Sequence, residues 1–379
     1  MKILLLGEYN ASHFNLKQGL LALGHDVLLV GHGDGFKKRP ADILFKQKFQ
    51  VGFWYNLRRI VHVLSGIDLN SVNMAMQFRK HQDKFKNFDV VQLINERPFG
   101  CLPKTETKLL SYIFKHNKKV FLLSNGTDYI SVKFALEGKY RYGILTPYFN
   151  KKGTRKDFLP ALVYVSPGHK RLHEFVYHHI KGVFSSDLDY FLPLEGHPKH
   201  LGLMPHPICL ENLQFQSLDT SEKIVIFHGI NSRNYFKKGN DIFEEAINKL
   251  KSTYWDKVEI KTVRDLPHQK YLESYNDAHI ILDMVYAYDQ GYNALEGMAK
   301  GKVVFTGAER EWLDYYQLKE DEVAINALPD ANQIYKKLCE LVENPEKITT
   351  IGKAARQFVE KIHDAHLIAT RSVKIWKDH

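Results

Sequence analysis

The sequence predicts an α/β protein made of two doubly wound, Rossmann-like domains that face a central cleft. With 379 residues, of which 44% are hydrophobic, the chain is long enough to form two cores. Short apolar runs alternate with helical stretches in both halves, which is typical of parallel sheets covered on both faces. Prolines in the segment 202–217 interrupt both patterns, so we expect the two domains to join there.

In the first half, the expected strands are apolar runs that end in polar residues. They are KILLLG (2–7), DVLLVGHG (26–33), FDVVQLIN (88–95) and KKVFLLSNGTD (118–128). The amphipathic stretch NLKQGLLALGHD (15–26) predicts a helix that ends at Gly24, because glycine favours helix C-termini. We place the first domain at residues 1–210.

In the second half, the same alternation predicts a second parallel sheet. The expected strands are EKIVIFHG (222–229), KVEIKTV (257–263), AHIILDMV (278–285) and KVVFTG (302–307). Helices are expected at GNDIFEEAINKLKSTY (239–254) and HQKYLESYNDA (268–278), and the periodicity from Pro345 onward is helical. We place the second domain at 211–361, and we expect 362–379 to form a C-terminal helix that packs back toward the first domain. In such folds a ligand binds at the carboxyl ends of the strands.

The composition argues against several classes of protein. Three cysteines without a Cys-x-x-Cys pair disfavour a disulfide framework and a zinc site, and they fit a reducing cytoplasm. The 19 histidines show no His-Glu-x-x-His spacing, and we assign the closest group, His173, His178 and His179, to surface or packing positions. No apolar run approaches the ~18 residues of a membrane span. The N-terminal run Ile3 to Leu6 is too short for a signal peptide. We therefore expect a cytoplasmic protein without a bound metal.

Charge is distributed unevenly along the chain. Residues 1–210 carry +14 and residues 211–379 carry −4, which together give the total of +10. The region 36–60 has seven Lys and Arg against one Asp, interleaved with aromatic residues such as Phe45, Phe49, Phe53, Trp54 and Tyr55, and 148–158 adds four cations against one acid. This composition suits an anionic membrane surface, at about 1 kcal/mol per cation. A plain solvated face and a nucleic-acid site are the alternatives. We favour peripheral contact with an anionic membrane, or a polyanionic acceptor, and we expect no nucleic-acid partner.

The loop after the strand at 222–229 has the composition of an anion site. Arg233 and Lys238 lie five residues apart, and Gly239 follows at the start of a helix. A helix N-terminus presents unpaired N–H groups and the positive end of the helix dipole. Two cations there would complete a diphosphate site without a metal. The alternative is a solvated basic loop.

A second candidate follows in DQGYNALEGMAKGKVVFTG (289–307). The turn 288–291 leads to Asn293, which we expect to be the N-cap of a short helix, and Glu296 stands three residues later, at capping-box spacing. Glu296 either bonds the backbone of Asn293 or accepts hydrogen bonds from the hydroxyls of a ribose, since an ionised carboxylate can take two. The residues alone leave both interpretations open.

These segments together resemble a known family. The order HGINSRNYFKKG, LPHQKYLESYNDAHIILD and YDQGYNALEGMAKGKVVFTG is similar to the C-terminal domain of retaining GT-B glycosyltransferases of family 4, also called glycosyltransferase group 1. The resemblance covers about residues 223–361. It implies that Arg233 and Lys238 bind the donor diphosphate and that Glu296 binds the ribose. Lys302 replaces a proline of the family, and Tyr288 stands where the family has its first glutamate.

The resemblance also outlines the rest of the nucleotide-sugar site. Asp289, next to Tyr288, is the candidate to take over the role of the missing glutamate. The other positions that we assign to this site in the second domain are Gly229, Gly291, Tyr292 and Asn293.

The first half resembles the acceptor domain of the same fold more weakly. GEYNASHFNLKQGLLALGHDVLLVG is similar to the opening strand, turn and helix of the family, so Gly7 and Asn10 are expected at the cleft beside the donor. In LLSNGTDY, Asn125 takes the place of a family histidine that lies beside the donor sugar. Asp128 either acts as a base or orients a hydroxyl, or it is only a cap residue after the strand. Asn95 and Glu96 are cleft candidates by position alone.

The resemblance implies a glycosyltransferase of the hexosyltransferase type, which moves a sugar from a UDP- or GDP-sugar to a glycan or lipid-linked acceptor in cell-surface polysaccharide synthesis. Arg233 and Lys238 would stabilise the leaving diphosphate, while Asn125 and Asp128 would act at the reacting centre. Transfer would proceed with retention and without a metal or other cofactor, with the departing phosphate taking the acceptor's proton. The expected location is the cytoplasm, at the inner face of the membrane. A GT-B sugar-nucleotide epimerase and a catalytically silent sugar-nucleotide-binding protein are the alternatives.

Overall fold

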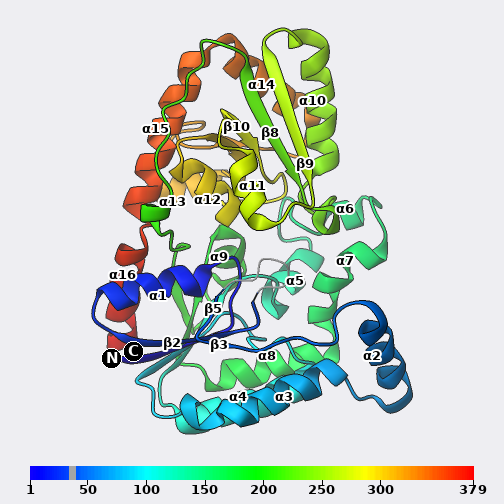
Figure 1. Ribbon diagram of the computed structural model, residues 1–379, viewed down its shortest axis with the longest axis vertical. Helices are drawn as coiled ribbons and strands as arrows, with labels where there is room; N and C mark the ends of the chain where they lie inside the picture. The colour runs from blue at the N-terminus through cyan, green and yellow to red at the C-terminus, as the bar shows by residue number, and fades with distance from the viewer. Residues whose placement is uncertain (34–39) are drawn as a thin grey trace.

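The computed structural model describes residues 1–33 and 40–379, and it confirms the predicted α/β architecture (Figure 1). The described part of the chain forms a seven-stranded sheet in the order β3-β2-β1-β4-β5-β6-β7 and a five-stranded sheet in the order β12-β11-β10-β8-β9. Every strand pair in these described sheets is parallel. The first sheet ends at Leu203 and the second begins at Ile224, on either side of the proline-containing segment.

The first sheet contains the four strands expected from the sequence and three short ones that the sequence did not reveal. Its strands are β1 Lys2–Leu6, β2 Asp26–Gly31, β3 Ile43–Leu44, β4 Val90–Leu93, β5 Val120–Ser124, β6 Gly182–Ser185 and β7 His200–Leu203. In β1, Leu4 and Leu6 enter one core while Ile3 and Leu5 enter the core on the opposite face. A strand buried on both faces reads as a continuous apolar run, which is why β1 was recognisable.

Helices cover both faces of the first sheet. They are α1 Ser12–Ala22, α2 Gly52–Ser65, α3 Leu69–His81, α4 Pro103–His116, α5 Tyr129–Leu136, α6 Thr146–Phe149, α7 Arg155–Leu162, α8 Pro167–His179 and α9 Leu188–Leu194.

The second domain repeats this design around a smaller sheet. Its strands are β8 Ile224–Ile230, β9 Val258–Arg264, β10 Ile280–Leu282, β11 Val303–Thr306 and β12 Ile325–Asn326. Its helices are α10 Asn240–Tyr254, α11 His268–Ser274, α12 Tyr292–Ala299, α13 Arg310–Tyr316, α14 Ala331–Glu343 and α15 Pro345–Ile362.

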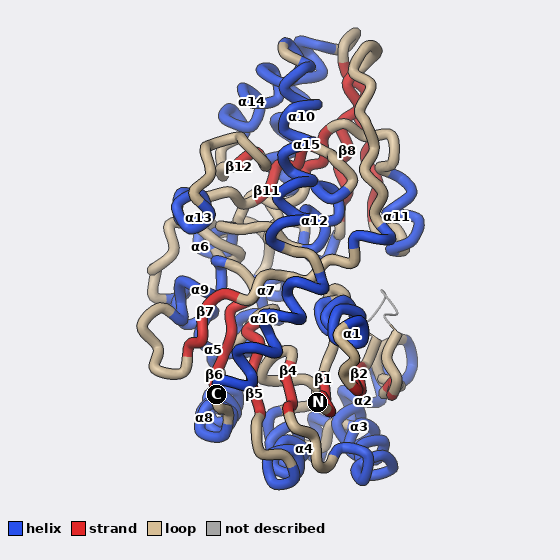
Figure 2. Tube along the Cα trace, turned by 90° about the vertical axis from the view of Figure 1, so that its left-hand side faces the viewer, coloured by secondary structure: helices blue, strands red, loops and turns tan. Residues whose placement is uncertain are grey.

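The chain returns to the first domain at its end. Helix α16, Ala365–Asp378, lies beside α1 (Figure 2), and the two pack so closely that a Cβ on Gly19 would lie 2.2 Å from the carbonyl oxygen of Ala365. Ile368, Ala369, Val373 and Trp376 share one core with β1. The helical periodicity from Pro345 is thus divided between α15 and α16, which are separated at His363 and Asp364.

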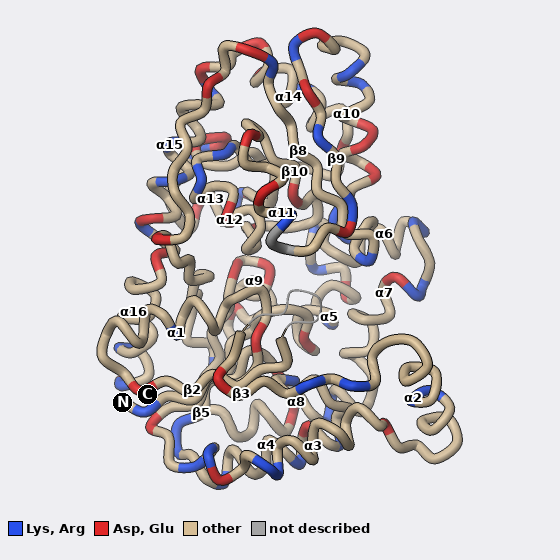
Figure 3. Tube along the Cα trace, in the orientation of Figure 1, with Lys and Arg blue, Asp and Glu red and all other residues tan. Residues whose placement is uncertain are grey.

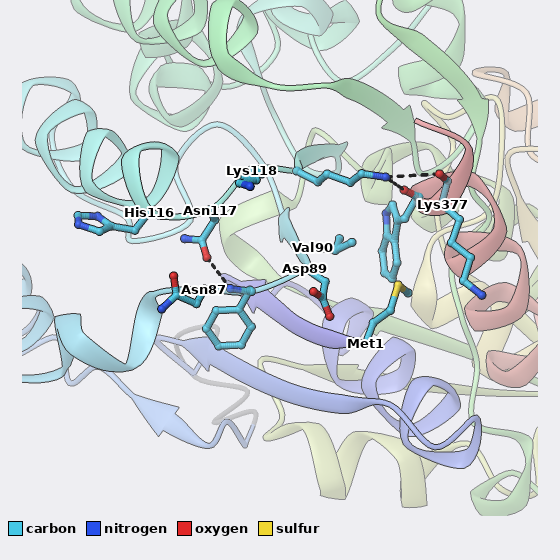
Figure 4. A pocket seen from close by; sticks show the side chains of 11 residues that line it. Met1, Asn87, Asp89, Val90, His116, Asn117, Lys118 and Lys377 are labelled. Carbon is cyan, nitrogen blue, oxygen red and sulfur yellow. Dashed lines mark hydrogen bonds between the residues drawn. The ribbon is translucent and has the colours of Figure 1, made fainter.

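A pocket at the amino-terminal end of the first sheet lies between β4, the end of α4 and α16 (Figure 4). Lys119 crosses it and donates from its Nζ to the carbonyl oxygens of Trp376 and Lys377, at 3.1 and 3.4 Å. A lysine that bonds the last carbonyls of a helix stabilises the helix C-terminus. This pocket therefore belongs to the attachment of α16.

None of the described helices combines the length and the apolar composition needed to cross a membrane. Of the basic, aromatic region 36–60, residues 36–39 lie outside the described residues, and the remainder forms β3, the segment after it and the first part of α2.

Candidate functional site

Residues that follow the strands of one sheet contact residues that follow the strands of the other. Arg141, in the segment between α5 and α6, lies 2.6 Å from the Glu309 carboxylate, which follows β11. The hydroxyl of Tyr142 donates to the same carboxylate. The backbone N–H of Leu188, which follows β6, donates to Oδ2 of Asp289 at 3.0 Å. The carboxyl ends of both sheets thus meet at the domain boundary, where doubly wound folds bind ligands.

In the second domain, one carboxylate organises the candidate site. Oδ1 of Asp283, directly after β10, accepts a hydrogen bond from Lys238 Nζ at 2.7 Å and another from Asn293 Nδ2 at 2.6 Å. Asp283 is buried, whereas Lys238 is about one-quarter exposed. The structure therefore brings together a cation from the β8–α10 loop and an amide from α12, through a residue that the sequence analysis did not single out.

The expected cap of α12 was wrong. Asn293 is the second residue of the helix, and Gly291 is its N-cap residue, with extended backbone and no side-chain capping bond. The side chain of Asn293 reaches Asp283 instead of the helix backbone. Because Asn293 is inside the helix, Glu296 lies one turn further along the same face.

Gly239 shapes the loop that carries Lys238. It is the N-cap of α10 with φ +72°, and a Cβ at this position would lie 2.6 Å from Cβ of Val285. Both its left-handed backbone and its close approach to Val285 require glycine. Lys238 is thereby fixed at the N-terminus of α10, next to the turn after β10.

Arg233 lies in the same loop but is exposed to solvent. Its backbone N–H donates to Oδ1 of Asn231 at 3.0 Å, and that of Ser232 donates to Oδ1 of Asp265 at 2.8 Å. Among the described residues, the Arg233 guanidinium makes no salt bridge. The loop backbone is therefore held in place, while this cation remains available to an anionic ligand.

Tyr271 closes the side of the cluster nearest β8. A Cβ on Gly229 would lie 2.3 Å from Cε2 of Tyr271, so the glycine lets the ring lie directly against the strand. Burial raises the pKa of the Tyr271 phenol, and the neighbouring charge of Asp283 raises it further. The charge of the half-buried Glu296 also raises the pKa of this phenol. Asp283, Asn293 and Glu296 therefore all contribute to the electrostatic environment of Tyr271.

In the first domain, the loop after β1 has an unusual backbone. Gly7 has φ +85°, and a Cβ there would lie 2.2 Å from Cγ2 of Ile94. Asn10 and Ala11 also adopt positive φ, at 53° and 71°, which is uncommon for residues other than glycine. Such backbone strain is concentrated at functional sites. His13 supports the loop by donating from Nδ1 to the Gly7 carbonyl at 2.8 Å, and burial lowers its pKa to about 3, so its ring is neutral.

Helix α12 faces this loop across the domain boundary. Tyr292, the first residue of α12, is buried, and its ring lies 4.6 Å from that of His206, in the segment that joins the two domains. Burial raises the pKa of its phenol well above the usual value, and Ser12 and Glu8 of the first domain are among the neighbours that perturb it. The loop with Gly7 and Asn10 and the α12 N-terminus thus lie on opposite sides of one boundary.

Two residues after β5, Asp128 and Asn125, differ in whether their side chains have hydrogen-bond partners. Asp128 is the N-cap of α5: Oδ1 accepts from the Ser131 backbone N–H at 2.7 Å, and Oδ2 accepts from the Ser124 hydroxyl. The structure therefore shows the capping role that was the simpler interpretation of Asp128. Asn125 is buried as well, but its Nδ2 has no hydrogen-bond partner among the described residues. Its amide remains able to donate to a ligand.

The buried Glu96 pairs with the half-buried His173, a contact that the sequence did not reveal. His173 Nδ1 donates to Glu96 Oε1 at 2.7 Å, and the His173 ring stacks on Tyr129 at 4.7 Å. Burial raises the pKa of Glu96, and the bond from His173 opposes that rise. His173 was expected to be a surface or packing residue, and its contact with Glu96 depends on α8 lying beneath the loop after β4.

Tyr288 and Asp289 hold the two domains together. The Tyr288 hydroxyl accepts from the backbone N–H of Arg141 at 2.8 Å, and its own N–H donates to Asp189 Oδ2 at 3.1 Å. Both carboxylate oxygens of Asp289 accept backbone N–H groups, from Leu188 and, at 2.6 Å, from Gln290. Burial and the charge of Asp187 raise the pKa of Asp289 to about 8. In this structure Asp289 is therefore used for the domain contact.

Comparison with known proteins agrees with this architecture. Residues 236–374 match the model of a family described as glycosyl transferase-like. A sequence search of curated proteins gives no match. The fold resembles sucrose-phosphate synthase from Thermosynechococcus elongatus, with 13% identity, a TM-score of 0.65, and coverage of 100% of this chain and 99% of that one.

Two further similar structures contain or act on uridine nucleotides, as their names state. Anabaena HepE in complex with UDP and glucose matches with 10% identity and a TM-score of 0.59, and both chains are covered fully. UDP-GlcNAc 2-epimerase from Neisseria meningitidis, bound to UDP-GlcNAc, matches with 12% identity and a TM-score of 0.55, again over both full chains. At this identity the likeness shows the fold, which is GT-B.

Proposed function

We propose that this protein is a glycosyltransferase that takes a sugar from a nucleotide-diphosphate-sugar donor. The observation that carries the proposal is the cluster of Lys238, Asp283 and Asn293 at the carboxyl end of the second sheet, with the exposed Arg233 in the same loop as Lys238. This cluster lies in a GT-B fold and largely within the segment that matches the glycosyl transferase-like model. The names of the HepE and epimerase structures favour a uridine nucleotide, with GDP as the alternative.

The donor diphosphate would lie between the β8–α10 loop and the N-terminus of α12. Arg233 and Lys238 would neutralise the charge that develops on the diphosphate as the glycosidic bond breaks, in place of a metal. Asp283 would hold Lys238 and Asn293 in position. Backbone N–H groups at Gly291 and Tyr292 would face the second phosphate, and Glu296 would accept hydrogen bonds from the ribose.

The acceptor would enter from the first domain. The loop with Gly7 and Asn10 would approach the donor, and the unpartnered amide of Asn125 would donate to a hydroxyl of the donor sugar. Asp128 would act mainly by fixing this loop, because both of its oxygens already accept hydrogen bonds. We propose retention of configuration, with the departing phosphate as the proton acceptor, and a glycan or lipid-linked acceptor of cell-surface polysaccharide synthesis, reached from the cytoplasm at the inner face of the membrane.

Calorimetric titration with UDP, GDP and their sugars tests the donor proposal. A ligand at 100 times its Kd adds about 2.7 kcal/mol of stability, so a thermal-shift screen can precede the titration. We expect binding of one nucleoside diphosphate and transfer of its sugar only when a glycan acceptor is added. If no nucleoside diphosphate binds, the assignment of Arg233 and Lys238 is wrong.

The similarity to UDP-GlcNAc 2-epimerase makes epimerisation of a nucleotide sugar the alternative activity. An epimerase converts the nucleotide sugar without an acceptor, so incubation with the donor alone separates the two activities. The Glu96–His173 pair is the group in the first domain that such proton-transfer chemistry would use. Binding without conversion or transfer to any acceptor would instead indicate a silent sugar-nucleotide-binding protein.

A further inference from the structure

Helix α2 is amphipathic, yet none of its described side chains is buried. Phe53, Leu57, Ile60, Val61 and Leu64 follow a helical spacing and lie on one face. On this face Phe53 is 73% exposed, Ile60 57% and Leu64 82%, whereas Leu57 and Val61 are half-buried. A helix of a globular protein normally buries such a face against the core, so this one presents its apolar face to something outside the domain.

The exposed apolar surface continues beyond this face. Trp54 borders it, and further exposed apolar side chains follow at both ends of α2 and on α3: Val51, Val63, Ile67, Val72 and Met76. In Figure 1, α2 stands at the outer edge of the first domain, away from the second domain. Exposed apolar side chains grouped on neighbouring elements in this way indicate a site of interaction with a protein or a membrane.

Charge distinguishes between these partners. The sequence has no Asp or Glu between Asp42 and Asp68, whereas it has Lys46, Lys48, Arg58 and Arg59 there. Figure 3 shows Lys and Arg along the segment that leads from β3 to α2. A second copy of this surface would bring like charges together. An anionic lipid surface is complementary both to the cations and to the apolar face.

The attachment of α2 keeps this surface in place. Arg58 forms an ion pair with Asp68, a buried carboxylate that also caps α3 by accepting from the Ser71 backbone N–H at 2.9 Å. Gly66, with φ +69°, ends α2 directly before this contact. The helix is therefore connected to the domain on the side of Arg58, where Leu57 and Val61 are half-buried, while Phe53, Ile60 and Leu64 remain exposed.

We propose that α2 inserts its apolar face into the headgroup region of an anionic membrane. Phe53, Ile60 and Leu64 lie against the acyl chains, Trp54 lies at the interface, and Lys46, Lys48 and Arg59 lie against the lipid phosphates. At 14 residues α2 is about 21 Å long, shorter than the ~30 Å of a bilayer core, so it lies along the surface. The use of such binding, to bring the site to a lipid-linked acceptor, rests on the proposed function; the binding itself does not.

The test is co-sedimentation of the full chain with vesicles of phosphatidylglycerol and phosphatidylcholine. We expect the parent protein to bind and the double variant I60E/L64E to bind at least tenfold more weakly. The matched control is the double variant Leu159→Glu and Trp255→Glu, which charges two exposed apolar residues elsewhere and should bind like the parent. Equal binding of I60E/L64E and the parent would overturn the proposal.

Two more measurements separate insertion from simple charge attraction. The fluorescence of Trp54 should shift to the blue on vesicle binding and be quenched by brominated lipids, and both effects should be absent in Trp54→Phe. The variant K46E/K48E should lose binding at low salt, while I60E/L64E should lose the part that persists at high salt. If only the charge variant loses binding, α2 does not insert. If the parent forms a dimer that I60E/L64E dissociates and neither binds vesicles, the surface is occupied by a second copy.

The last measurement compares nucleotide binding by I60E/L64E with nucleotide binding by the parent protein. I60E/L64E should bind nucleoside diphosphate as the parent does, because α2 is remote from β8, β10 and α12, the elements around the candidate nucleotide site (Figure 1). Loss of vesicle binding with intact nucleotide binding supports the membrane proposal. Vesicle binding by a parent that binds no nucleotide would leave the membrane proposal standing and overturn only the proposed function.

Discussion

The Lys238 ammonium lies 2.7 Å from the Asp283 carboxylate, an ion pair between the loop after β8 and the end of β10. The same carboxylate oxygen accepts from Asn293 of α12. Three segments that are far apart in the sequence therefore converge on one buried acid. A cation held this way is oriented before a ligand arrives, which is the condition for electrostatic stabilisation without reorganisation.

Asp283→Asn should weaken nucleotide binding about tenfold. The amide keeps the shape of the carboxylate but removes the charge that positions Lys238, and the lost pair should also cost about 1–3 kcal/mol of stability. Calorimetric titration and thermal unfolding measure the two effects. Asp314→Asn is the matched control, because Asp314 forms only an exposed pair with Arg310. Unchanged nucleotide affinity in Asp283→Asn would show that Lys238 does not contact the diphosphate.

Arg233→Ala should reduce kcat/KM for sugar transfer by about 10²–10³-fold, the effect of removing one preorganised donor from a developing charge. The fold should be unaffected, because the Arg233 side chain is exposed. Steady-state kinetics and the melting temperature give the two readouts. Arg310→Ala removes another exposed guanidinium, on α13, and should leave kcat/KM unchanged. Equal activities of the two variants would contradict the role of Arg233.

Asp289 should make the domain contact sensitive to pH. Its folded pKa of about 8 lies above the ~3.9 of an unfolded chain, so the folded state holds the extra proton and its contribution to stability is lost as pH rises from about 4 to about 8. Asp187 and Asp189 are the charged neighbours.

Asp289→Asn removes this titration, so the dependence of the melting temperature on pH should become shallower between about pH 4 and 8, while Asp189 retains its own share. The exposed Asp256→Asn should keep the slope of the parent. A variant Asp289→Asn with the parent's slope would show that Asp289 is ionised throughout this range.

Gly239→Ala should destabilise the second domain by more than a backbone effect alone. The new Cβ would meet Val285 at 2.6 Å, in addition to the strain of φ +72°. Gly196→Ala is a matched control, since Gly196 has φ +75° but open space around its Cβ position. We expect Gly239→Ala to lose about 1–3 kcal/mol more than Gly196→Ala in thermal unfolding. Equal losses would mean that the loop relaxes away from Val285.

Much of the fold was predictable from the sequence because its central strands are buried on both faces. Such strands, β1 and β8 among them, read as apolar runs without alternation. The strands β6 and β7 were missed because GVFS and HLGL are short and contain glycine, and only their neighbours in the sheet give them strand geometry. The position of Gly239 after a strand and a loop likewise predicted the N-terminus of α10. There Gly239 has a positive φ, which requires glycine.

The residues of the candidate site were likewise only partly predictable from the sequence. The sequence determined that cations, a glycine and a glutamate follow the strands of the second sheet, because those residues are adjacent along the chain. Only the tertiary structure decided that Asn293 bonds Asp283 rather than capping its own helix, that His173 pairs with Glu96, and that Tyr288 and Asp289 hold the domains together. Each of these contacts joins residues that are separated in sequence. Their partners are fixed by how the sheets, helices and domains pack, and that packing is not a local property of the chain.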